Sequence, residues 1–167
     1  MKKYRGVFLK NEREIGLLRE ANRMVALILD ELGRQVRPGL STMACEEIVQ
    51  KMCAEFKVKP GFQGLYGYPY ALCCAVNEVI VHGFPSEECV LKEGDIVSFD
   101  MGVVYQGMNG DAARTFMIGE VSDEAARLVR VTEESLALGV AEARPGNDLY
   151  AISEAVQRHA EGAGFHV

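Results

Sequence analysis

Two aspartates lie within a stretch that otherwise reads as a buried hairpin, and that placement needs a chemical explanation. Asp100 and Asp111 fall inside residues 94–116, GDIVSFDMGVVYQGMNGDAARTF, where apolar side chains crowd around both. A carboxylate in apolar surroundings is costly unless something pairs with it. The partner could be a structural hydrogen bond, an arginine or a metal ion.

Strand geometry brings the two carboxylates together. In an antiparallel hairpin whose turn is Gln106-Gly107, Asp111 lies opposite Gly102 and diagonal to Asp100, on the same face. Two converging carboxylates repel each other unless a proton or cation intervenes, and oxygen ligands suit Mn, Fe(II), Co or Zn. The competing interpretation pairs Asp111 with Arg114 and uses Asp100 as a turn cap. Geometry alone leaves both open.

His82 and a glycine-rich aromatic loop are two further candidates. His82 follows the strand-like VIV and precedes Gly83, a position that suits an active-site residue, although a lone histidine there is more often a hydrogen-bonded surface residue. Residues 61–70, GFQGLYGYPY, are expected to form a loop. Its Phe62, Leu65 and Tyr68, with Tyr66, could line a pocket for an apolar side chain, or pack over a sheet edge.

The elements that must position these residues follow from periodicity. Apolar residues recur at helical steps over 11–35, and Ser41 or Thr42 can cap a second helix that runs to about 56. Strands are predicted over 71–83 with a turn at 77–78, then over 95–105 and 111–119, joined through 106–110. Helical patterns return over about 122–142 and 148–162. The fold class is therefore α+β.

One local pattern occurs twice. An Arg-Pro-Gly turn at 37–39 and another at 144–146 each separate two helices, with the β-rich block between the pairs. This predicts a duplicated unit whose second copy has its helices but lacks its strands, which would begin near residue 168. The plainer alternative is that Pro-Gly turns commonly follow helices and indicate no duplication.

Composition narrows the classes of function. The 167 residues, 49% of them hydrophobic, suit one globular domain, and the net charge of −6 without a basic block argues against nucleic acid as a direct partner. No apolar run is long enough to span a membrane or to serve as a signal peptide. Five cysteines without a paired spacing favour a reducing cytoplasm.

Four motifs taken together resemble one enzyme family. GYP, VNEVIVHGFP, LKEGDIVSFDMG and GMNGDAARTF, in this order and spacing, are similar to the type I methionine aminopeptidases. The resemblance covers nearly the whole chain. It implies the duplicated pita-bread fold and a single catalytic domain over 1–167 that is incomplete at its C-terminus. It also implies hydrolysis of the N-terminal methionine from nascent peptides, with the ribosome as a possible partner.

The resemblance also assigns roles to individual residues. Positions that match Asp100 and Asp111 bind a pair of divalent metal ions in the family, and the position that matches His82 assists catalysis beside the substrate. Those matching Phe62, Leu65, Tyr68 and Cys73 line the methionine pocket.

The chain departs from the family pattern at its end. The family's remaining ligands, a histidine and two glutamates, come from later motifs that this sequence does not contain. We therefore expect the chain alone to be inactive and to self-associate through an exposed sheet edge. The alternatives are a non-catalytic peptide- or protein-binding module on the same fold, or an enzyme similar to X-prolyl dipeptidases.

Overall fold

The computed structural model describes residues 2–167, which divide into two compact units, the first ending at Glu120 and the second being Val121–Val167. The first unit holds two helices and a four-stranded sheet, preceded by a small hairpin of β1 (Lys2–Tyr4) and β2 (Val7–Leu9) that the sequence did not predict. The second unit holds two helices. The pattern of helices and strands is mixed, as the α+β prediction requires.

Helices α1 (Glu12–Gln35) and α2 (Thr42–Phe56) begin at polar caps, close to the predicted bounds. The Asn11 side chain accepts from the Glu14 backbone N–H while Glu14 reaches back to Asn11, a capping box that satisfies two free donors. The Ser41 hydroxyl accepts from the Ala44 N–H at the start of α2. Both helices pack their buried stripes into one core with the sheet.

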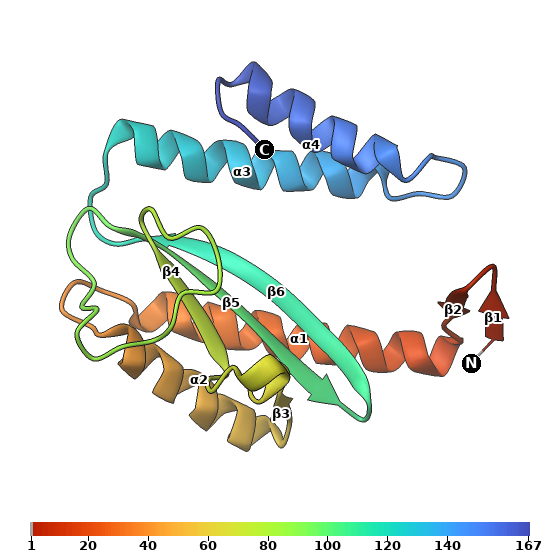
Figure 1. Cartoon of the computed structure of the whole chain (residues 1–167), viewed down its shortest axis with the longest axis horizontal. Helices are drawn as coiled ribbons and strands as arrows, with labels where there is room; N and C mark the ends of the chain where they lie inside the picture. Colours follow the sequence, from red (N-terminus) through yellow and green to blue (C-terminus); the bar gives the residue numbers. More distant parts are fainter. Residues whose placement is uncertain (1) are drawn as a thin grey trace. The chain divides into compact units, whose positions relative to one another are not determined.

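The sheet is antiparallel, with β5 (Ile96–Tyr105) at its centre (Figure 1). On one side β5 pairs along its whole length with β6 (Met108–Met117). On its other side it pairs with β4 (Leu72–Val76) and, further along, with the short β3 (Lys59–Pro60). The loop between β3 and β4 contains a 3₁₀ turn, η1 (Leu65–Gly67).

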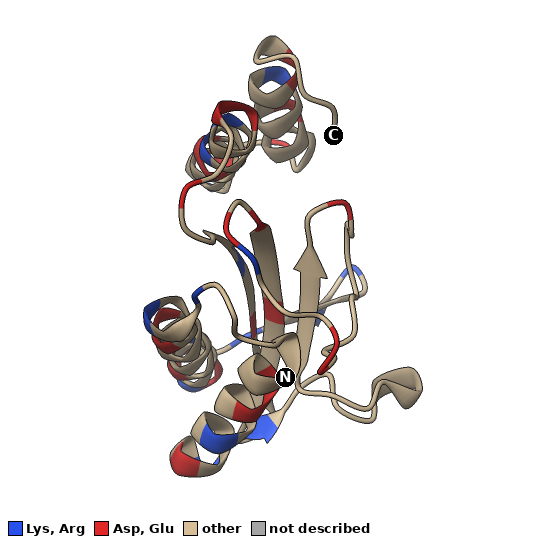
Figure 2. Cartoon of the chain, turned by 90° about the vertical axis from the view of Figure 1, so that its left-hand side faces the viewer, with Lys and Arg blue, Asp and Glu red and all other residues tan. Residues whose placement is uncertain are grey.

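Alternation along β5 separates two chemically different faces. The odd-numbered Val97, Phe99, Met101 and Val103 are fully buried in the core shared with α1 and α2. Asp100 is half-buried and points to the opposite face. The only charged side chains on β4, β5 and β6 are Asp100, Asp111 and Arg114, and most of the charge lies on helices and loops (Figure 2).

The hairpin turn is Gln106-Gly107, as the predicted register requires, and the connection is shorter than the predicted 106–110. Tyr105 pairs with Met108, so Gln106 and Gly107 alone form the turn, and both have positive φ, 47° and 81°. This is the two-residue turn whose twist matches that of the flanking strands. The ladder therefore starts at Met108, three residues before the predicted strand.

The strand predicted over 71–83 was wrong in its second half. Strand β4 ends at Val76, the chain turns at Asn77 with φ 52°, and Val79–Val81 form an exposed loop. His82 is therefore a loop residue and does not end a strand.

The second unit consists of α3 (Asp123–Glu142), capped by the Ser122 hydroxyl, and α4 (Tyr150–Gly162). Its Arg-Pro-Gly turn has the same backbone signature as the first: Gly39 and Gly146 have φ of +89° and +95°. The helix–turn–helix pattern thus occurs twice, as predicted. Across residues 2–167, no helix combines the length and the apolar character that crossing a bilayer demands.

Candidate active site

The register of the β5–β6 hairpin places both aspartates on the face opposite the helical core. Gly102 pairs with Asp111, and Asp100 is two residues from Gly102, so the two side chains share a face as predicted. Arg114 pairs with Phe99 and points to the other face, where it forms a 2.5 Å ion pair with Asp30 of α1. The competing Asp111–Arg114 pairing is therefore wrong, and Asp100 lies in mid-strand and caps no turn.

The two carboxylates influence each other. Burial raises the pKa of Asp100, and so does the charge of Asp111, while nearby His82 lowers it. Burial also raises the pKa of Asp111. Within residues 2–167, no hydrogen bond or ion pair is formed by either carboxylate. The pair is therefore a repulsive, partly desolvated arrangement of the kind that a bound cation stabilises.

His82 reaches the site from the loop that follows β4. Its backbone is left-handed, with φ 57°, which is uncommon outside glycine and typical of constrained functional positions. The next residue, Gly83, accepts a 2.8 Å hydrogen bond from the Cys74 N–H, and a Cβ at this position would collide with the Cys74 carbonyl oxygen. Only glycine allows the loop to approach β4 this closely.

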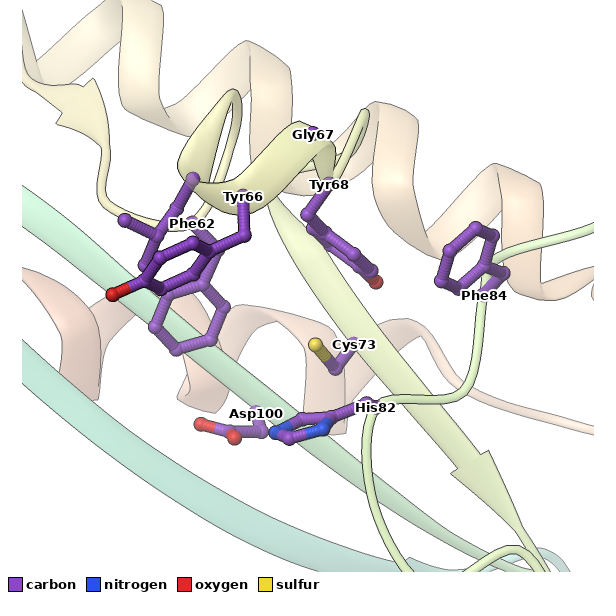
Figure 3. A pocket seen from close by; sticks show the side chains of 9 residues that line it. Phe62, Tyr66, Gly67, Tyr68, Cys73, His82, Phe84 and Asp100 are labelled. Atoms are coloured by element: carbon purple, nitrogen blue, oxygen red, sulfur yellow. The ribbon is translucent and has the colours of Figure 1, made fainter.

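A cavity of about 380 Å³ opens in front of Asp100 and His82. This falls within the roughly 300–1,000 Å³ of small-molecule pockets. In Figure 3, Asp100 and His82 lie side by side, Phe62 and Tyr66 form one wall, and Tyr68 and Phe84 form the other. The lining residues are Phe62, Leu65, Tyr66, Gly67, Tyr68, Cys73, His82, Phe84 and Asp100.

The structure brings together all five residues predicted to contact substrate. Phe62, Leu65, Tyr68, Cys73 and His82 border this cavity, and Asp111 lies beside Asp100 without lining it.

Tyr68 is the best anchored residue of the wall. Its hydroxyl donates a 2.8 Å hydrogen bond to the Leu72 carbonyl and lies 3.4 Å from the Gly83 carbonyl oxygen. Its ring packs edge-on against Phe84, with centroids 5.0 Å apart. Burial and a hydrogen bond with the Cys73 thiol raise the pKa of Tyr68 well above its usual range, so it stays neutral.

Sequence reasoning missed two residues. Phe84 lines the cavity, and the only available signal for it was its position two residues after His82. Asn22 of α1 was also missed; its side-chain oxygen accepts a 3.2 Å hydrogen bond from the Asp111 backbone N–H. No sequence pattern links positions so far apart.

The donors present suit a divalent cation but do not complete its coordination. Asp100 and Asp111 supply carboxylate oxygens, which hard divalent ions prefer. No group of three or more His, Cys, Asp or Glu in the described part of the chain could hold a metal ion. The fit is therefore that of two ligands of a larger site.

Residues 16–167 match the family model described as "Metallopeptidase family M24". The chain belongs to this family. It is 44% identical over 161 residues to the methionine aminopeptidase of Clostridium perfringens, and 42% identical to methionine aminopeptidase 1 of Bacillus subtilis; each alignment covers 96% of this chain and 64% of the relative. The chain thus spans slightly less than two-thirds of the length of each of these relatives.

Solved structures support the same family and fold. The methionine aminopeptidase of Thermotoga maritima superposes with a TM-score of 0.94 at 42% identity, over 96% of this chain and 65% of that one. A Bacillus anthracis Xaa-Pro dipeptidase superposes with a TM-score of 0.81 at 23% identity, which shows only a shared fold. The predicted pita-bread fold and the resemblance to methionine aminopeptidases are confirmed.

Proposed function

We propose that the chain carries the methionine-binding part of a metal-dependent aminopeptidase that removes N-terminal methionine. The observation that carries this proposal is the apolar, aromatic cavity that opens directly onto Asp100 and His82. A narrow apolar pocket beside a carboxylate pair is what an enzyme needs to hold an unbranched side chain next to the bond it cleaves. Relatives named methionine aminopeptidase support the choice of side chain.

In this proposal Phe62, Leu65, Tyr68 and Cys73 bind the methionine side chain and exclude water from it. The cavity walls are aromatic, and the polarizable thioether of methionine makes favourable contacts with aromatic rings. The neutral Tyr68 hydroxyl already donates to the Leu72 carbonyl. An apolar side chain that enters the cavity therefore does not leave this donor without a hydrogen-bond partner.

Asp100 and Asp111 would supply two of the ligands for a pair of divalent ions, of Co, Mn, Fe(II) or Zn. When bound, such ions polarise the scissile carbonyl and activate water for attack. His82, beside Asp100, donates its ring N–H to the substrate carbonyl oxygen as charge develops there, or passes a proton to the departing amine. These roles treat residues 1–167 as part of one catalytic domain.

The proposed partners follow from this activity. The substrates are nascent peptides that begin with methionine, which places the protein in the cytoplasm and near the ribosome. We also propose that the isolated chain self-associates along the outer edge of β6, because β5 is the only strand of the described residues that pairs with it.

The test uses a completed chain, defined as residues 1–167 joined to the remaining C-terminal part of the Clostridium perfringens relative. With Mn²⁺ it should release methionine from the peptide Met-Gly-Met. Asp100→Asn should abolish release and reduce bound metal, whereas Asp123→Asn, in the first turn of α3, should change neither. A folded, metal-loaded completed chain without turnover would refute the proposal.

One observation favours a second candidate, a peptide-binding module without catalysis. The cavity is formed by the first unit alone, whereas the described residues contain no group of three or more side chains that could hold a metal ion. If this candidate is right, the completed chain should bind Met-Gly-Met without cleaving it, whether Co, Mn, Fe(II) or Zn is supplied.

A further inference from the structure

A buried carboxylate on α2 holds the segment at which β4 begins. Glu46 of α2 is 4% exposed. Its Oε1 accepts from the Ala71 backbone N–H at 2.9 Å and from the Gln50 side-chain amide at 2.8 Å, and its Oε2 accepts from the Leu72 N–H at 2.9 Å. One side chain of α2 therefore anchors Leu72, the first residue of β4, and Ala71, the residue before it.

All three neighbours of Glu46 are donors, which makes the residue type specific. A carboxylate can accept at both oxygens, and hydrogen bonds to an ionised acceptor are stronger than neutral ones. A glutamine has the same shape, but its NH₂ group would face a backbone N–H or the Gln50 amide. Ala71 and Leu72 are fully buried, so water cannot replace a lost acceptor.

The anchored segment leads directly to the cavity wall. Strand β4 is at the edge of the sheet, and its outward groups are satisfied by side chains and loops. The Leu72 N–H donates to Glu46, the Leu72 carbonyl accepts from Tyr68, and the Cys74 N–H donates to the Gly83 carbonyl. Gly83 follows His82, so a path of hydrogen bonds along one strand edge runs from Glu46 past Tyr68 to the histidine loop.

We propose that Glu46 is a positioning residue for the methionine pocket. By fixing Ala71 and Leu72 it sets the position of β4, from which Cys73 projects into the cavity and to which Tyr68 and the His82–Gly83 segment are tied. That the positioned pocket binds methionine rests on the proposed function, whereas the effect of Glu46 on the position of β4 does not depend on it. Glu46 touches neither the cavity nor the carboxylate pair and acts only through these neighbours.

The first experiment measures amide hydrogen exchange by NMR in wild-type residues 1–167, Glu46→Gln and Glu47→Gln. Glu47 is the exposed neighbour of Glu46 and serves as the control. In Glu46→Gln the Cys74 amide should exchange roughly tenfold faster, because the Ala71–Leu72 segment that positions the start of β4 is no longer fixed. The Phe99 amide in central β5 should change much less. Equal acceleration at Cys74 and Phe99 would mean general destabilisation and would overturn the proposal.

A second variant tests the same path if Glu46→Gln does not fold. Tyr68→Phe removes only the hydroxyl that links Leu72 and Gly83. The Cys74 amide, which donates to the Gly83 carbonyl, should then exchange faster, while those of Ala71 and Leu72, still bound by Glu46, should stay protected. An unchanged Cys74 amide would overturn the proposal.

A ligand-binding experiment distinguishes a failure of this inference from a failure of the proposed function. L-methionine amide, which imitates an N-terminal methionine, should shift resonances of Tyr68, Cys73 and His82 in the wild type, and Glu46→Gln should weaken its binding by roughly tenfold. If the amide does not bind the wild type, the proposed function fails and the exchange data still decide the role of Glu46. If it binds wild type and Glu46→Gln equally, the positioning role is refuted.

Discussion

Asn22 of α1 holds the backbone of Asp111. The Asn22 amide oxygen accepts from the Asp111 N–H, and its amide nitrogen donates to the Leu18 carbonyl within α1. The helix thereby fixes the position of a carboxylate on a strand far away in the sequence. This makes Asn22 relevant to the site without any contact to a ligand.

Asn22→Ala should lower the free energy of unfolding by about 0.5–1 kcal/mol, because one exposed hydrogen bond between helix and strand is lost. The Asp111 amide should also lose its protection from hydrogen exchange. Urea unfolding followed by circular dichroism gives the first quantity and NMR the second. Asn109→Ala, an exposed change on the same strand, is the control. Retained protection at Asp111 would show that Asn22 does not hold it.

His82→Ala in the completed chain should slow the release of methionine by about a hundredfold, as expected for loss of a proton donor. Metal content should stay nearly intact, because the carboxylates are the proposed ligands. Turnover of Met-Gly-Met and metal analysis of the purified variant measure the two effects. A variant that loses its metal would instead make His82 a ligand.

At the scale of elements, the contact between α1 and β6 depends on the absence of a side chain at Gly110. A Cβ there would lie 2.5 Å from the Ala21 carbonyl carbon and 2.7 Å from the Asn22 backbone nitrogen. These are backbone atoms of a helix and cannot move aside individually. The strand that carries Asp111 can therefore approach α1 only with glycine at this position.

Gly110→Ala should destabilise the chain by about 1–3 kcal/mol, the usual cost of overpacking. Gly16→Ala is a matched control that should change the stability in the opposite direction. Gly16 lies on α1, where an added methyl group would meet no atom within 4 Å, so the change should stabilise by about 0.5–1 kcal/mol through helix propensity. Urea unfolding of both variants checks the pair. A neutral Gly110→Ala would mean that β6 and α1 separate at little cost.

The elements also show which features a sequence can predict. The helices and the β5–β6 register follow from local signals, namely apolar periodicity, polar caps and a two-residue turn, and each acts over a few residues. Val79–Val81 have the composition of a strand, yet Gly83 takes the outward position beside Cys74 and leaves them exposed. Competition between segments for one strand edge is a tertiary effect and leaves no local pattern.

The residues of the site likewise divide into those predictable from local sequence and those that depend on tertiary packing. The spacing of Asp100 and Asp111 fixes their common face, because strand geometry has a period of two. Glu46 also reads as a plausible residue for a helix start, and its actual partners lie 25 and 26 residues further along the chain. Supporting residues of this kind are found only once the packing of α2 on β4 is known.

At the scale of the whole molecule, the number of metal ligands limits what residues 1–167 can do. Ions such as Mg²⁺ or Mn²⁺ take about six oxygen or nitrogen donors. Asp100 and Asp111 are two converging carboxylates, and residues 2–167 contain no group of three or more such ligands. Water must supply the remaining donors, and each water is held less firmly than a fixed side chain.

We therefore expect residues 1–167 alone to bind Mn²⁺ weakly and to leave Met-Gly-Met intact. Titration calorimetry should detect no tight site, and the weak heat should disappear in Asp100→Asn, whereas Asp123→Asn should behave as the wild type. Sedimentation velocity on the same samples reports self-association along β6. Tight binding of two ions with turnover by a monomer would contradict this expectation. Other side chains, such as His159, His166 or Glu78, would then have to complete the site, and substitution of each in turn would identify the ligand.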